Sequence, residues 1–243
     1  MNDEHLDYQL KQWRFDPESN CVRLLKGADG RDVIQMRVDL GILQLETSGR
    51  PDGSKPEGFP TLLDSLLHAE TLAPDFELDE AVCMEIDREF VQFYHRRVAW
   101  LRLQRFEKAV ADANHTLALM DFCQDHSPCE EWTLQHEQHR AFVIFHRTQA
   151  AALAAIEEQS PQGAIAAIDE GLELIEENFN DMGWEEDFES DELVQRLVQL
   201  RDSLRSEFTI QKSLREQLAE AVELEQYELA ARLRDEMSRE KSN

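Results

Sequence analysis

The chain has 243 residues, 42% of them hydrophobic, which is enough to bury the core of one or two domains. Its 51 acidic residues outnumber the 25 basic ones and give a formal net charge of −26, so the surface as a whole repels nucleic-acid phosphates. Composition therefore argues against direct nucleic-acid binding and favours a soluble acidic protein.

The first residues of the chain, its lack of long apolar stretches and its cysteines predict a cytoplasmic location. The first residues are acidic and carry no apolar run, which is not the pattern of a signal peptide. No stretch approaches the roughly twenty apolar residues that a membrane span needs. The cysteines, Cys21, Cys83, Cys123 and Cys129, are scattered, which is typical of free thiols in a reducing compartment.

Strand signals are confined to residues 13–46. Residues 21–26 lead into a turn cluster at 27–30, and apolar side chains then alternate with polar or smaller ones at Ile34, Met36, Val38 and Leu40. Gly41 is expected to interrupt this run as a bulge before a further apolar segment at 42–45. We therefore predict a small antiparallel sheet.

Residues 49–58 form a predicted loop, because prolines and glycines interrupt any regular element there. Within it, Arg50 and Asp52 belong to an Arg-Pro-Asp-Gly sequence. We weighed a functional role for this pair against a simple turn and favour the turn.

From Pro60 onward the hydrophobic pattern becomes helical. Thr61 is a suitable cap for a helix that begins at Leu62, and residues 79–103 form a long amphipathic run. The end of that run and the residues after it contain a set of mainly small and aromatic residues at helical spacing, namely Ala99, Trp100, Leu103, Phe106, Ala109 and Asp112. These positions resemble the core of a tetratricopeptide repeat. Arg97 stands where that family prefers a small residue, and we expect it to weaken close helix packing.

A second copy of the repeat is predicted over residues 150–174. Its matching alanine, Ala164, lies 55 residues after Ala109, whereas the family spacing is about 34. We therefore expect a pair of degenerate repeats rather than a regular array.

Residues 178–190 are expected to be an acidic loop, with Trp184 either packed on a neighbouring helix or available to a partner. Ser190 is the predicted cap of the next helix. Leu193, Leu197, Leu200 and Leu204 follow a seam that Leu214 and Leu218 resume. This seam is too short and too interrupted for a confident coiled coil, so we predict a helical stalk.

The last thirty residues contain two amphipathic segments separated by a polar break. The pattern rests on Leu218, on Glu225-Gln-Tyr-Glu, on Ala230-Ala and on Leu233-Arg-Asp. This segment resembles the UVR motif, a helical hairpin of the excision-repair subunits UvrB and UvrC that is also found in some chaperone ATPases and kinase activators. The resemblance implies a contact between proteins, for which the candidate residues are Leu218, Val222, Tyr227, Ala230, Ala231, Leu233, Arg234, Asp235 and Met237.

The predicted fold is mainly α. It comprises a small N-terminal β-hairpin or sheet with a loop over residues 1–58 and a tetratricopeptide-like helical domain over 59–180. An acidic loop and a long connecting helix follow over 181–212, and a UVR-type hairpin occupies 213–241.

A metal site is the strongest chemical alternative in the sequence. Its candidate ligands are Cys123, His126, Cys129, His136 and His139, and the two last histidines share a helical face. The usual paired-cysteine spacings are absent, so a plain loop with exposed histidines is favoured and no bound metal is expected. Kinase activators that carry the UVR motif also bear paired cysteines, so that branch is disfavoured.

No phosphate-binding glycine loop or nucleophile elbow occurs in the sequence. We therefore expect a non-enzymatic adaptor without a cofactor. Its hairpin would dock a partner's UVR-like hairpin or helix, or a second copy of itself, without membrane or direct nucleic-acid contact. The alternatives are an accessory factor of nucleotide excision repair and a metal- or redox-responsive regulator of a chaperone ATPase or kinase.

Overall fold

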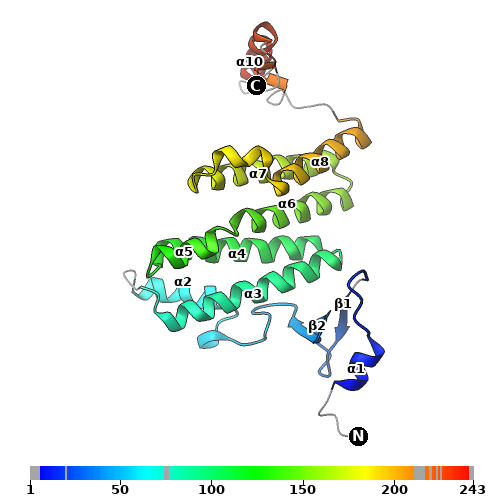
Figure 1. Ribbon diagram of the computed structural model, residues 1–243, viewed down its shortest axis with the longest axis vertical. Coiled ribbons are helices and arrows are strands. Elements are labelled where there is room, and N and C mark those ends of the chain that lie inside the picture. Colours follow the sequence, from blue (N-terminus) through cyan, green and yellow to red (C-terminus); the bar gives the residue numbers. More distant parts are fainter. Residues whose placement is uncertain are drawn as a thin grey trace.

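The computed structural model describes residues 6–19, 21–73, 77–210, 217–218, 221–222, 224 and 226–240. It is mainly helical, with a small sheet near the N-terminus (Figure 1). The N-terminal elements are α1 (Asp7–Gln12), β1 (Val22–Lys26), β2 (Asp32–Val38), β3 (Gly41–Glu46) and the 3₁₀ turn η1 (Pro56–Gly58). The helical body follows with α2 (Leu62–Leu72), α3 (Glu80–Arg102), α4 (Phe106–His126), α5 (Glu130–Glu137), α6 (Arg140–Glu157) and α7 (Pro161–Asp181). The 3₁₀ segment η2 (Glu185–Ser190), α8 (Glu192–Phe208) and α10 (Tyr227–Glu240) complete the described elements.

The sheet is three-stranded and antiparallel in the order β1-β2-β3. The alternation of its apolar residues places Val22, Ile34, Met36 and Leu45 in one cluster with residues of α3, α4 and α6. The bulge that the sequence predicts at Gly41 is not present. Gly41 is the first residue of β3 and pairs with Val38, and the exposed Leu40 lies in the turn before it.

The helical body contains two helix pairs, α3–α4 and α6–α7, whose turns have the same geometry. Gln104 and Gln159 both adopt left-handed backbone conformations, with φ of 55° and 59°. Arg105 N–H donates to Trp100 O at 2.9 Å, and Ser160 N–H donates to Ala155 O at 2.8 Å. Both turns are Schellman motifs, and the second lies 55 residues after the first.

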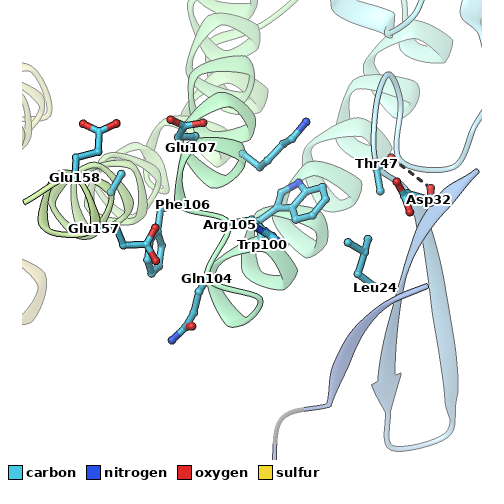
Figure 2. Close-up of a pocket in the computed structure, with 12 residues that line it drawn as sticks. Leu24, Asp32, Thr47, Trp100, Gln104, Arg105, Phe106, Glu107, Glu157 and Glu158 are labelled. Atoms are coloured by element: carbon cyan, nitrogen blue, oxygen red, sulfur yellow. Dashed lines mark hydrogen bonds between the residues drawn. The ribbon is translucent and has the colours of Figure 1, made fainter. Parts of the chain in front are cut away.

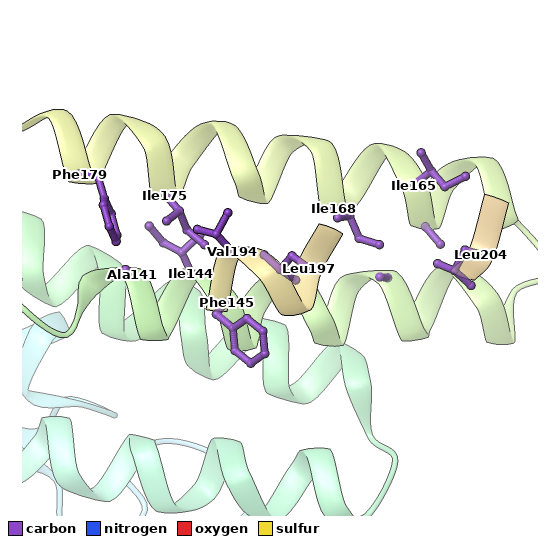
Figure 3. Packing of buried hydrophobic residues seen from close by; sticks show 12 residues of the cluster. Ala141, Ile144, Phe145, Ile165, Ile168, Ile175, Phe179, Val194, Leu197 and Leu204 are labelled. Atoms are coloured by element: carbon purple, nitrogen blue, oxygen red, sulfur yellow. The ribbon is translucent and has the colours of Figure 1, made fainter. Parts of the chain in front are cut away.

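Helix α7 packs on α6 and α8 through an apolar seam. Figure 3 shows Ile168, Ile175 and Phe179 of α7 facing side chains such as Ile144 of α6 and Leu197 of α8. The approach is close at Gly171, where an added Cβ would lie 2.7 Å from Thr148 Cβ on α6. This contact is why a glycine occurs in the middle of α7.

Side-chain caps begin several helices. Thr61 caps α2, as the sequence predicts, and Asp79 caps α3, accepting from the N–H of Val82. Ser190 does not cap α8, because it belongs to η2 and its hydroxyl donates to Asp187 O. Asp191 caps that helix instead, accepting from the N–H groups of Leu193 and Val194.

Helix α8 ends at Phe208, where Thr209 turns the backbone into the left-handed region with φ of 56°. The connecting helix therefore ends at the residue before Thr209. Leu197 and Leu204 are buried against the body, and Leu214 lies outside the described residues.

Charged side chains fasten the loop after β3 to the helices. Arg96 of α3 forms a bidentate pair with Asp112 of α4, at 2.9 and 2.7 Å, and its Nη1 donates to Glu46 O and Gly49 O. Arg50 is also buried, and its Nη2 lies 2.9 Å from Glu85 Oε2. The predicted turn is present, with Gly53 N–H donating to Arg50 O, but Arg50 also anchors the loop on α3.

Candidate protein-interaction surfaces

Within its described residues, the C-terminal hairpin has a core of its own. Ala221, Ala230 and Leu233 are buried together, and Leu218 packs against them. Gln226 N–H donates to Ala221 O at 2.7 Å and closes the turn before α10. Ala221 and Ala230, one from each helical segment, therefore let the two segments approach closely, as expected of a helical hairpin.

A second set of motif residues faces outward. Val222 and Tyr227 are 53% and 67% exposed, and Leu224 and Leu229 are exposed beside them. Ala231, Arg234 and Asp235 are exposed as well, and the arginine lies 3.2 Å from the aspartate. The side chain of Met237 lies outside what the structure describes. The predicted partner-binding residues thus divide into an internal core and an outer apolar surface.

The predicted repeat core lies between the first helix pair and the sheet. Ala99, Trp100, Phe106 and Ala109 are buried with Ile34 and Met36, while Leu103 is half-buried. Figure 2 shows Trp100 beside the α3–α4 turn, with Leu24 of β1 on the sheet side of a pocket of about 410 Å³. These aromatic residues therefore hold the sheet on the body.

A larger groove of about 700 Å³ lies among α3, α4, α5 and α6. Its walls are largely apolar and aromatic, being formed by Phe90, Val91, Tyr94, Met120, Phe142 and Val143. Polar side chains of the α5 region, including Gln135 and Gln138, complete its lining. The sequence did not reveal this groove, because its walls come from four separate segments.

Arg97 lines the groove and is almost fully buried. Its Nη1 donates to Thr116 Oγ1 at 3.0 Å, and its Nε donates to His146 Nδ1 at 3.3 Å. Burial lowers the pKa of Arg97 to about 10, which still leaves it charged at neutral pH. The guanidinium that stands at the small-residue position of the repeat pattern is thus held between the helices by hydrogen bonds.

His146 is expected to make the fold sensitive to acid. Burial and the neighbouring Arg97 guanidinium lower the pKa of His146 to about 4, against about 6.5 in the unfolded chain. Between these values the unfolded state binds the extra proton, so stability falls as pH drops from 6.5 to 4, by about 2–3 kcal/mol. Urea denaturation at pH 7, 5.5 and 4 measures this loss.

His146→Gln provides the control, because the amide oxygen still accepts from Arg97 but does not titrate. The difference in stability between the two proteins isolates this one histidine from every other titrating group. Parallel pH profiles for both proteins would contradict the assignment.

The candidate metal ligands are not brought together. Cys123 is buried in an apolar cluster, and burial raises the pKa of its thiol to about 12. Cys129 is exposed, and His136 Nε2 lies 3.0 Å from Asp87 Oδ1. His126 Nε2 lies 3.2 Å from Glu70 Oε1, and His139 lines the groove. Across the described residues, no three His, Cys, Asp or Glu side chains are grouped so as to hold a metal ion.

Trp184 is half-packed rather than free. It follows α7, where its indole meets Phe179 edge-on with a centroid distance of 6.0 Å, and 38% of its surface stays exposed. Packing on a neighbouring helix, the favoured interpretation of this aromatic, therefore accounts for most of its surface.

A family model described as the UvrB/uvrC motif matches residues 209–241. The match covers the hairpin and supports the resemblance seen in the sequence. Searches of curated proteins and of solved structures found no match to the chain. Within the described part of the chain, no helix has the length and apolar character needed to cross a membrane.

Proposed function

We propose that this protein is a non-enzymatic adaptor that joins partner proteins through its C-terminal hairpin and its helical body. The observation that carries the proposal is the outer apolar surface of a hairpin that matches the UvrB/uvrC motif. Its exposed apolar side chains are those of Val222, Leu224, Tyr227 and Leu229, and the described residues of the hairpin core are Ala221, Ala230 and Leu233.

The small size of a helical hairpin favours a docking role. Full burial of an apolar side chain contributes about 1.5–3 kcal/mol, and two of the core residues are alanines that contribute less. A helical hairpin of this size is marginal in isolation because ordering each residue costs about 1.5 kcal/mol. Packing of the outer surface against another helix therefore stabilises the hairpin and the complex together.

The body supports the adaptor proposal through its repeated architecture. The two Schellman turns recur at the 55-residue interval that the repeat-like sequence predicts, between helix pairs of similar packing. We infer a pair of degenerate tetratricopeptide-like units, an architecture that commonly presents a binding face.

Replacing Val222 and Tyr227 together with aspartate is expected to weaken self-association or capture of a UVR-containing partner at least tenfold. Both side chains are mostly exposed, so the hairpin core is retained, and an aspartate at the first residue of α10 suits the helix dipole. The loss follows from placing two charges in an apolar contact. Light scattering measures self-association, and binding to purified UvrB or UvrC measures capture.

Leu72→Asp combined with Met84→Asp is the matched control. These side chains are also more than half exposed, and they lie outside the hairpin. The control adds the same charge and is expected to leave association unchanged. If the hairpin variant associates as strongly as the control, the adaptor proposal fails at its main site.

An accessory role in nucleotide excision repair is the second candidate, and the match to the UvrB/uvrC motif favours it. In that case the protein would contact repair proteins rather than DNA, because its net charge of −26 opposes phosphate binding. Selective binding to UvrB or UvrC over an unrelated helical hairpin supports this role. Equal binding to both leaves the general adaptor function.

A further inference from the structure

The groove among α3–α6 is lined by a buried cation, Arg97, that forms no ion pair with the residues the structure describes. Arg97 is 1% exposed, and both of its hydrogen-bond partners, Thr116 and His146, are neutral acceptors. In the described part of the chain, no carboxylate oxygen lies within ion-pair distance of it. The Asp112 carboxylate acts on Arg97 from a distance and raises its pKa, but it is held in a bidentate pair by Arg96.

An uncompensated buried charge is costly, and proteins rarely keep one without a counter-ion. The chain has 51 acidic residues, more than enough to supply a carboxylate at this position. Among the described residues none lies within ion-pair distance of Arg97, so its guanidinium can accept a carboxylate from another molecule.

The lining of the groove is unusually poor in negative charge for this protein. Of the described residues that line it, Asp87 alone carries a carboxylate, which already accepts from Trp132 Nε1 at 3.1 Å and lies 3.0 Å from His136 Nε2. A neighbouring depression between α4–α5 and α7 is lined by Asp121, Glu130, Glu137, Glu177 and Asp181. An anionic partner is thus repelled by the second depression and accepted by the groove.

We propose that this groove binds a peptide segment of a partner protein that presents one carboxylate between apolar side chains. The carboxylate pairs with Arg97, and the apolar side chains lie on Val91, Tyr94 and Phe142. Amides of Gln135 and Gln138 supply donors and acceptors for the peptide backbone. This assignment rests on the adaptor function and names the chemistry of the partner at the body, apart from the hairpin.

Fluorescence anisotropy with two pools of dye-labelled hexapeptides tests the proposal. Both pools have amidated ends and mixed Leu, Ile and Phe positions, and they differ only in a central Glu or Gln. We expect the Glu pool to bind at least tenfold more tightly, and this preference to vanish in Arg97→Met. Equal binding of the two pools to the native protein would overturn the proposal, as would an unchanged preference in the variant.

Thermal unfolding keeps this test independent of misfolding. Methionine matches the length of the arginine stem without its charge, so Arg97→Met is expected to raise Tm by a few degrees while the preference for the Glu pool is lost. If Arg97 served only to stabilise the fold, its replacement would lower Tm. A lower Tm would therefore count against a binding role for Arg97.

Val91→Asp provides a second variant, because Val91 is exposed on the wall of the groove and its replacement leaves the core intact. It is expected to weaken binding of the Glu pool at least tenfold, whereas Met84→Asp on the same helix changes nothing. The hairpin variant, Val222→Asp with Tyr227→Asp, should still bind the peptide. A failure of the groove proposal can therefore be distinguished from a failure of the adaptor proposal at the hairpin. If Val91→Asp binds like Met84→Asp, the groove is not the peptide site.

Discussion

Replacing Glu89 with alanine is expected to reduce the free energy of unfolding by about 3–5 kcal/mol, because it removes the shared partner of several buried groups. The Glu89 carboxylate is fully buried and accepts from the N–H groups of Leu62 and Leu63 at 2.9 and 3.2 Å. It also lies 2.9 Å from His115 Nε2 and 3.3 Å from Arg50 Nε. One side chain therefore holds the start of α2, the loop after β3 and α4 against α3.

Urea denaturation followed by circular dichroism measures this loss. Glu85→Ala is the matched control, because Glu85 lies one helical turn away and pairs with the same arginine, but its side chain is 37% exposed. An exposed pair contributes about 0–1 kcal/mol, so the control should change little. Similar losses for the two variants would show that Glu89 does not organise this region.

The elements of the fold were largely predictable, because they depend on local sequence patterns. The alternation at Ile34 and Met36 indicated the sheet, and both side chains are buried on its inner face. Thr61 identified the start of α2, and the amphipathic run over residues 79–103 identified α3. Errors in the predicted helix ends were small. At the start of α8, for example, Ser190 and Asp191 are both suitable caps, and Asp191 is the one used.

The charged interior was not predictable in the same way, because its partners are distant in sequence. Arg50 reaches Glu85 and Glu89 on α3, so the turn sequence alone could not distinguish a buried anchor from an exposed loop. Arg96 and Arg97 did leave a signal. They lie three and four residues after the buried Phe93, and therefore on the inner face of the helix. Two arginines on that face indicate that the interior contains groups that bind a cation.

The candidate site was predicted in part. The motif residues of the hairpin were found from their pattern, but the pattern did not separate the buried Ala230 and Leu233 from the exposed Val222 and Tyr227. That division depends on how the two segments pack. The groove around Arg97 left no linear motif, because its lining is assembled from α3, α4, α5 and the start of α6.

Gly171→Ala is expected to lower the free energy of unfolding by about 3 kcal/mol, although alanine is the better helix former by about 1 kcal/mol. An added methyl group would lie 2.7 Å from Thr148 Cβ, a distance that rotation of the threonine side chain cannot relieve. Helices α6 and α7 must therefore move apart along a seam that includes Ile168 and Ile175. Chemical denaturation of the variant measures the cost.

A double-mutant cycle with Thr148→Ala assigns this cost to the helix contact. The threonine hydroxyl is buried without a hydrogen-bond partner, so its removal alone is expected to be mild. In the double variant part of the clash disappears, and a favourable coupling of about 1 kcal/mol or more is expected. Additive effects would mean that α6 and α7 do not meet at these residues, and the second helix pair of the repeat would then need a different packing.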